Sequence, residues 1–239
     1  MPTSCERRLI GRQLSAIRDA DVVTALFPCS AEAIEKECPG SCVQWICLPA
    51  NVPVGVEPCF DRFRRKLLFI GNRAYIPGLK VIASAVREFN ALNPSSPFDL
   101  DVIGIDSESA GLTDPFVTCH GYLRKDVDGE KDLYYSLLRS AAALVAVSRT
   151  WVGASSVVEA MALGTPVIVS PNIELERMIG DMDCGRWCEP TAEGVLASLE
   201  YLSEMDDAGY TRMCRSAYEK AREWTWDAFV ERWCSSVGL

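Results

Sequence analysis

The feature that most constrains the fold of this chain is an alternation of short apolar runs with helical patterns between residues 66 and 169. The apolar runs cover Lys66–Ile70, Leu100–Ile105, Phe116–Cys119, Leu144–Val147 and Pro166–Val169. Amphipathic patterns over Gly78–Asn93, Asp132–Ala142 and Ser155–Leu163 separate them. Buried strands that alternate with helices indicate a parallel sheet covered on both faces. We therefore expect an α/β fold with a Rossmann-like, doubly wound sheet.

A second, shorter α/β pattern precedes this run. Residues 1–20 predict a helix, Val22–Phe27 a strand, Ala31–Glu37 a helix capped by Ser30, and Val43–Leu48 another strand. Residues 49–66 are rich in Pro and Gly, which is typical of a connector. We expect 1–60 to be a partial N-terminal segment with its linker. Residues 61–239 then form the main domain, with helices from Thr191 onward.

Net charge and hydropathy disfavour binding to nucleic acid and a segment that spans a membrane. The formal net charge is −9 and the sequence pI is about 4.8, which disfavours a nucleic-acid surface. No apolar run reaches the length of about 18 residues that a membrane span needs, so we expect a soluble protein. The odd cysteine count, with no signal peptide pattern before the first helix, predicts a reducing, cytoplasmic location. A basic cluster at Arg62, Arg64, Arg65 and Lys66 is interpreted as a solvated linker. Contact with anionic headgroups at the membrane periphery stays open as its alternative.

The cysteines do not predict a metal site. Eleven are present, several inside apolar stretches, where they behave as small hydrophobic residues. The single histidine, His120, has no nearby cysteine pair of suitable spacing and is interpreted as structural. We therefore expect neither a metal nor a cofactor.

Two loops are placed where a parallel sheet binds ligands, beyond the carboxyl ends of its strands. One is Gly71-Asn72-Arg73. The other runs from Ser148 to Ser156 and contains four small residues at a helix start, Gly153, Ala154, Ser155 and Ser156. Small residues let backbone N–H groups approach an anion, and the helix dipole favours it. The alternative is an ordinary helix capped by Ser155. Glu159, one turn later, is placed to accept hydrogen bonds from a diol such as a ribose, or to complement the dipole.

Several motifs together resemble group 1 glycosyltransferases of the GT-B fold. The strongest is Glu159-Ala-Met-Ala-Leu-Gly-Thr-Pro-Val-Ile168, with Ser148 standing eleven residues before its glutamate. The other matching segments are Leu67–Gly71, Cys119–Gly121, Cys184–Pro190 and Glu223–Asp227. The resemblance covers about residues 60–239, and residues 1–60 look like the last elements of the family's N-terminal domain.

This resemblance implies an enzyme with two Rossmann-like domains and an active site between them. The C-terminal domain would hold a nucleotide-diphosphate sugar as donor, with Glu159 on the ribose and Tyr122 as a stacking surface. The N-terminal domain would hold the acceptor, whether saccharide, lipid-linked or other. Basic residues and a helix start would neutralise the diphosphate without a metal.

The chain departs from the family pattern in its charged groups. A family Arg and Lys are replaced by Asn72 and Pro77, so Arg73 and Lys80 are the expected substitutes. The first acid of the family's Glu-x7-Glu pair would fall at Trp151.

Most of the family's N-terminal domain has no counterpart in these residues. We therefore expect self-association or a partner chain that supplies it, and no efficient transfer by this chain alone. One alternative is a nucleotide-sugar-binding subunit or non-catalytic relative. A second is another GT-B enzyme, such as a sugar-nucleotide 2-epimerase.

Overall fold

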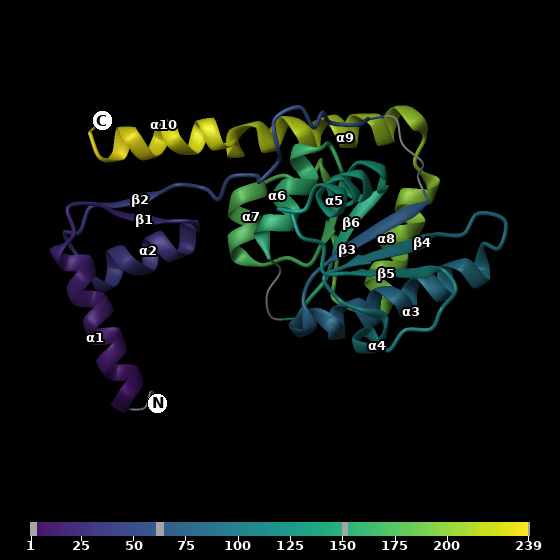
Figure 1. Cartoon of the computed structure of the whole chain (residues 1–239), viewed down its shortest axis with the longest axis horizontal. Helices are drawn as coiled ribbons and strands as arrows, with labels where there is room; N and C mark the ends of the chain where they lie inside the picture. Colours follow the sequence, from purple (N-terminus) through teal and green to yellow (C-terminus); the bar gives the residue numbers. More distant parts are fainter. Residues whose placement is uncertain (1–3, 61–64, 150–152, 239) are drawn as a thin grey trace.

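A computed structural model describes residues 4–60, 65–149 and 153–238 of the chain (Figure 1). The strands are β1 Val23–Ala25, β2 Val43–Trp45, β3 Lys66–Ile70, β4 Asp99–Ile103, β5 Val117–Gly121, β6 Ala143–Ala146, β7 Val167–Val169 and β8 Gly185–Trp187. The α-helices are α1 Ser4–Asp19, α2 Pro28–Glu37, α3 Ile76–Leu92, α4 Ser107–Ala110, α5 Asp128–Ser140, α6 Ala154–Ala162, α7 Ile173–Ile179, α8 Ala192–Glu204, α9 Asp207–Ala221 and α10 Trp226–Ser236.

The main body is built on a parallel six-stranded sheet with the order β5-β4-β3-β6-β7-β8. The chain first moves outward from β3 to β5, and then returns to the other side of β3 with β6. This order reverses between β3 and β6, which is the arrangement of a doubly wound Rossmann-like fold. The expected fold class is confirmed.

Two apolar layers cover the faces of this sheet. On one face α3, α8 and α9 pack over side chains that include Leu67, Phe69 and Val145. On the other face α5, α6 and α7 pack over Leu68, Leu144 and Val169. Successive residues of β3 thus contribute to opposite layers, as strand geometry requires. Burial on both faces explains why the strands appear in the sequence as apolar runs.

The N-terminal elements form a separate, smaller unit. Strands β1 and β2 pair in parallel, and α2 lies against them. In Figure 1 this unit lies to one side of the main body, and α10 extends from the body toward the same side. A helix, a strand, a second helix and a second strand thus precede the connector.

The connector between the unit and the body is fixed by hydrogen bonds along its length. The Ala50 N–H donates to the Trp224 carbonyl across 2.6 Å, and the Cys59 N–H donates to the Leu163 carbonyl across 3.1 Å. The Tyr135 hydroxyl donates to the carbonyl of Asn51. The connector thus follows the surface of the body instead of leaving it.

Helix α2 begins earlier than expected, and Ser30 is not its cap. The helix starts at Pro28, and its exposed backbone N–H at Cys29 donates to the carboxylate of Glu174 on α7 across 2.9 Å. Glu174 is buried, and its carboxylate complements the dipole of α2 from another part of the chain. Arg177 of α7 also pairs with Glu32 of α2. These contacts attach the N-terminal unit to the body.

Candidate functional site

A cavity of about 670 Å³ lies at the carboxyl ends of β3, β4 and β6. It lies where the strand order reverses, which is where ligands bind in open α/β sheets. Its floor comes from the strand ends, its walls from the loop after β5 and from the start of α6. The lining residues used below are Gly71, Asn72, Tyr75, Gly104, Tyr122, Lys125, Tyr134, Gly153, Ser155, Ser156 and Glu159.

Glycines let the elements of the floor approach one another closely. Gly104, directly after β4, has φ +92°, and a Cβ there would lie 2.0 Å from the Gly71 carbonyl oxygen. A Cβ at Gly78, in the first turn of α3, would lie equally close, 2.0 Å, to the Val147 carbonyl oxygen. Only glycine fits these positions, because a side chain would push the strand ends apart. The cavity therefore depends on backbone packing as well as on side chains.

The start of α6 lines the cavity through Gly153, Ser155 and Ser156. Gly153 occupies the cap position in an extended conformation and makes no side-chain cap hydrogen bond. The sequence-based alternative of a Ser155 cap is thus wrong, and Ser155 and Ser156 line the cavity instead. The N–H groups at such a helix start suit an anionic ligand.

Glu159 lies on α6 at the bottom of the cavity and has two charged or polar partners. Lys125 Nζ donates to its Oε1 across 2.6 Å, and the Tyr134 hydroxyl donates to its Oε2 across 2.5 Å. The Glu159 side chain is 5% exposed, whereas that of Lys125 is 31% exposed. Each carboxylate oxygen has two lone pairs, so Glu159 keeps acceptor capacity for a ligand hydroxyl.

Tyrosines form much of the remaining wall. Tyr122 is 79% exposed at the rim, which leaves its ring available for stacking. Tyr75 lies across the cavity from α6, with its hydroxyl 3.7 Å from the position of a Cβ at Gly153. Burial, and then the negative charge of Glu159, raise the pKa of Tyr134 far above its ordinary value. Tyr134 therefore keeps its proton and acts as a hydrogen-bond donor to Glu159.

Most of the residues selected from the sequence come together in this cavity. Gly71, Asn72, Tyr122, Gly153, Ser155, Ser156 and Glu159 all line it. Asn72 also accepts a hydrogen bond from the Ala74 N–H, so its side chain shapes the turn after β3. Ala154 is buried beneath the lining as the first residue of α6.

Arg73 and Lys80 are not among the lining residues. Arg73 donates to the Ser109 hydroxyl across 3.0 Å and lines a separate surface hollow beside Asp106. Lys80 is exposed on α3. Trp151, the departure from the family's acidic pair, lies outside the described residues, as do Arg62 and Arg64 of the basic cluster.

His120 has an acidic partner that the sequence did not reveal. Its Nε2 lies 2.6 Å from Asp101 Oδ1, between neighbouring strands β5 and β4. This contact lies within the sheet, and neither residue lines the cavity.

No helix in the described part of the chain is both long and apolar enough to cross a membrane. Likewise, no group of three His, Cys, Asp or Glu side chains in these ranges is arranged to hold a metal ion.

Lys125 and Tyr134 are the site residues that the sequence did not indicate. Lys125 is 34 positions from Glu159, and Tyr134 is 25 positions from it. Tyr134 stands in the expected helix after β5, and Lys125 in the loop that leads to it. The position of that loop could have indicated these residues, because the loop follows a strand at the ligand-binding edge of the sheet.

The strand order and the cavity at its reversal define a Rossmann-like domain of the GT-B type. A family model described as "Glycosyl transferases group 1" matches residues 64–204, and this chain belongs to that family. The resemblance seen in its motifs is thereby confirmed. No match was found among curated protein sequences.

Solved structures support the same fold at low sequence identity. Sucrose-phosphate synthase from Thermosynechococcus elongatus is 18% identical with a TM-score of 0.72, over 98% of this chain and 61% of that one. The GtfA/B complex is 13% identical with a TM-score of 0.71, over 97% of this chain and 48% of that one. Anabaena Alr3699/HepE, in complex with UDP and glucose, is 14% identical with a TM-score of 0.69, over 99% of this chain and 67% of that one. This chain thus spans about half to two thirds of the length of these structures.

Proposed function

We propose that this chain binds a nucleoside-diphosphate sugar in the cavity between β3 and β6, as the donor of a glycosyl transfer reaction. The observation that carries the proposal is the buried Glu159 beside the open start of α6. A carboxylate suits the diol of a ribose, and helix N–H groups suit a diphosphate. A cavity of about 670 Å³ also has the size of a typical small-molecule site.

Each part of the donor then has a matching part of the cavity. The ribose diol hydrogen-bonds to Glu159, and the base stacks on the exposed ring of Tyr122. The diphosphate lies over Gly153, Ser155 and Ser156, where the dipole of α6 favours negative charge. The sugar extends from the diphosphate toward the open side of the cavity. The similar structure of Alr3699/HepE is a complex with UDP and glucose, which supports this choice of ligand class.

We also propose that the leaving diphosphate is stabilised by the helix start and by basic side chains, so that transfer needs no metal. Preorganised N–H donors aimed at developing charge are an effective form of such stabilisation. Donor affinity measured in excess EDTA and in Mg²⁺ tests this part. Equal affinities are expected, and binding that appears only with Mg²⁺ would contradict it.

The test of donor binding is calorimetry of the purified chain with matched ligands. The panel is UDP, GDP and ADP, each with its bare nucleoside, followed by the UDP-, GDP- or ADP-sugar whose base binds. One diphosphate is expected to bind clearly more tightly than its nucleoside. If none of the three diphosphates binds at millimolar concentration, the proposal is wrong.

The acceptor side of the cleft requires more structure than the N-terminal unit provides. We propose that further acceptor-side strands, on this polypeptide or on a partner chain, cover an apolar face. The candidates for this face are Trp226, Val230 and Trp233, at helical spacing on α10, and Trp45 on β2, all more than two-fifths exposed. Exposed apolar side chains gathered on one side of a molecule mark an interaction surface.

Self-association in solution tests this proposal, because an apolar face that lacks its cover should bind a second copy of the chain. The chain with W226S and W233S is expected to remain monomeric where the unmodified chain self-associates in ultracentrifugation. An unmodified chain that is monomeric at all concentrations would contradict the proposal.

A further inference from the structure

Lys125 supplies the positive charge of the cavity. It is the only lysine or arginine among the described lining residues. Arg73 and Lys80, the substitutes expected from the sequence, both lie outside this lining. A diphosphate entering the cavity therefore meets one cationic side chain, and that side chain is already paired with Glu159.

The position of Lys125 allows it to change partners. Its ammonium lies 2.6 Å from Glu159 Oε1 and 4.1 Å from the centroid of the Tyr134 ring. The Lys125 side chain is 31% exposed, so a ligand meets it readily, whereas the Glu159 side chain is only 5% exposed at the bottom of the cavity. The lysine thus stands between the open cavity and the carboxylate.

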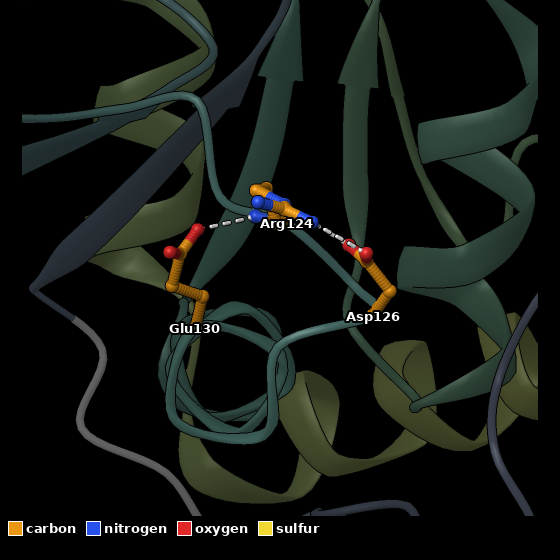
Figure 2. Close-up of polar contacts among 3 residues, drawn as sticks. All are labelled: Arg124, Asp126 and Glu130. Carbon is orange, nitrogen blue, oxygen red and sulfur yellow. Dashed lines mark hydrogen bonds and ion pairs between the residues drawn. The ribbon is translucent and has the colours of Figure 1, made fainter.

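The loop that carries Lys125 is tied down on both sides of it. Figure 2 shows the guanidinium of Arg124 paired with Asp126 and the backbone of Arg124 held by Glu130. The pair measures 2.7 Å between Nη2 and Oδ2, and the Arg124 N–H donates to Glu130 Oε2 across 2.6 Å. Being exposed, the Arg124–Asp126 pair contributes little to stability. Together the two contacts hold the backbone of the loop in place. Any movement of the Lys125 ammonium therefore comes from its flexible four-carbon side chain.

We propose that Lys125 changes partner on ligand binding, from the Glu159 carboxylate to a phosphate of the donor. Breaking a partly buried ion pair is unfavourable unless both charges gain new partners. A nucleoside diphosphate supplies both, since its phosphate takes the ammonium while its ribose diol takes the carboxylate. A nucleoside without phosphate supplies only the diol and must compete with Lys125 for Glu159. The exchange therefore selects ligands that carry both groups.

This inference rests on the proposed donor site and deepens it. It assigns Lys125 the cationic contact that the sequence had given to Arg73 and Lys80. It also predicts that phosphate and ribose recognition are coupled through one ion pair.

The test compares a nucleoside with its diphosphate in K125M and in a matched control. The control is K131M, because Lys131 is also ion-paired and 33% exposed but lies outside the cavity. Calorimetry uses uridine and UDP, or the corresponding guanosine or adenosine pair if that diphosphate is the one bound. K125M is expected to weaken diphosphate binding at least tenfold and to leave nucleoside binding equal or tighter. K131M is expected to match the unmodified chain.

Other outcomes separate the two proposals. Diphosphate binding that survives in K125M, or equal losses for both ligands, would overturn the role of Lys125 while the donor site stands. An unmodified chain that binds no diphosphate overturns the donor site and this inference together. K125R should restore diphosphate binding, since it keeps the charge. If K125M does not fold, the double variant K125M/E159Q replaces it, with E159Q as its control. If these two proteins prefer the diphosphate over the nucleoside to the same extent, the inference is also overturned.

Discussion

The Tyr134 hydroxyl donates a 2.5 Å hydrogen bond to Glu159 Oε2, which joins helix α5 to helix α6 at the bottom of the cavity. Tyr134 is almost completely buried, so its phenol remains protonated and oriented. One oxygen of the carboxylate is thus held by α5, while the other lies beside Lys125, the side chain that the ligand can reach. The orientation of Glu159 is therefore fixed before a ligand enters.

Removing this hydrogen bond should weaken both the fold and the site. Tyr134→Phe keeps the ring under Lys125 but removes the donor. Hydrogen bonds to charged groups contribute about 1.5–3 kcal/mol, so the free energy of unfolding in urea should fall by about that amount. Diphosphate affinity should fall severalfold because Glu159 is less well oriented. An unchanged urea midpoint would show that this bond does not stabilise the fold.

The neighbouring Tyr135 predicts a loss of stability at alkaline pH. Burial, and then the charge of Glu159, raise its pKa from 10.0 to about 12. The unfolded chain loses this proton first, so the stabilisation is complete below about pH 10 and is lost as the pH rises through about 12. Tyr135 should account for about 1–2 kcal/mol of that loss, after allowance for solvent screening.

Thermal unfolding measured from pH 9 to 12 checks this prediction. Tyr135→Phe should show a shallower fall of Tm than the unmodified chain between pH 10 and 12. Equal slopes for the two proteins would mean that Tyr135 does not titrate differently in the folded state.

The close approach of Gly104 to Gly71 predicts a sterically sensitive position on the floor of the cavity. In Gly104→Ala the new Cβ would meet the Gly71 carbonyl oxygen at 2.0 Å in a backbone conformation with φ +92°. Strain and overpacking together should cost about 2–4 kcal/mol. Gly111→Ala is the matched control, since Gly111 has φ +61° with no atom near its Cβ position. That variant should lose only about 1 kcal/mol. Equal urea midpoints for the two variants would contradict the steric argument.

Arg73 and Lys80 should matter less for the diphosphate than Lys125 does. Neither lines the cavity, and Arg73 is engaged with Ser109. Charges outside the site act only through screened, long-range attraction, so R73M/K80M should weaken diphosphate binding by about twofold or less at physiological salt. A loss in R73M/K80M that matches the loss in K125M would return these residues to the site and restore the original sequence-based assignment.

The sequence predicted the central elements of the fold well, because their signals are local. Strand β3 has the expected bounds, since a run of apolar residues buried on both faces is visible in the sequence itself. Strand β8 was missed because it has only three residues, Gly185–Trp187, with a charged residue at its centre, and lies at the sheet edge. The early start of α2 was also missed, because its capping carboxylate, Glu174, lies 145 positions away.

The same distinction holds for the cavity. Glu159 and the small residues before it were found because the helix start and its motif are continuous in the sequence. The partners of Glu159 were not found, because Lys125 and Tyr134 reach it only after the loop following β5 folds over the sheet edge. Sequence spacing therefore identified the acid, whereas the folded chain identified the cation beside it.

The most direct test of the whole account is the affinity of the bound nucleoside diphosphate for E159Q and for E174Q. Both glutamates are buried, but only Glu159 lines the cavity. The neutral amide removes a charged acceptor that should contribute about 1.5–3 kcal/mol to ribose binding. We predict at least a tenfold loss in folded E159Q and an unchanged affinity in E174Q. Equal affinities in E159Q and the unmodified chain would show that the nucleotide is not held at this site.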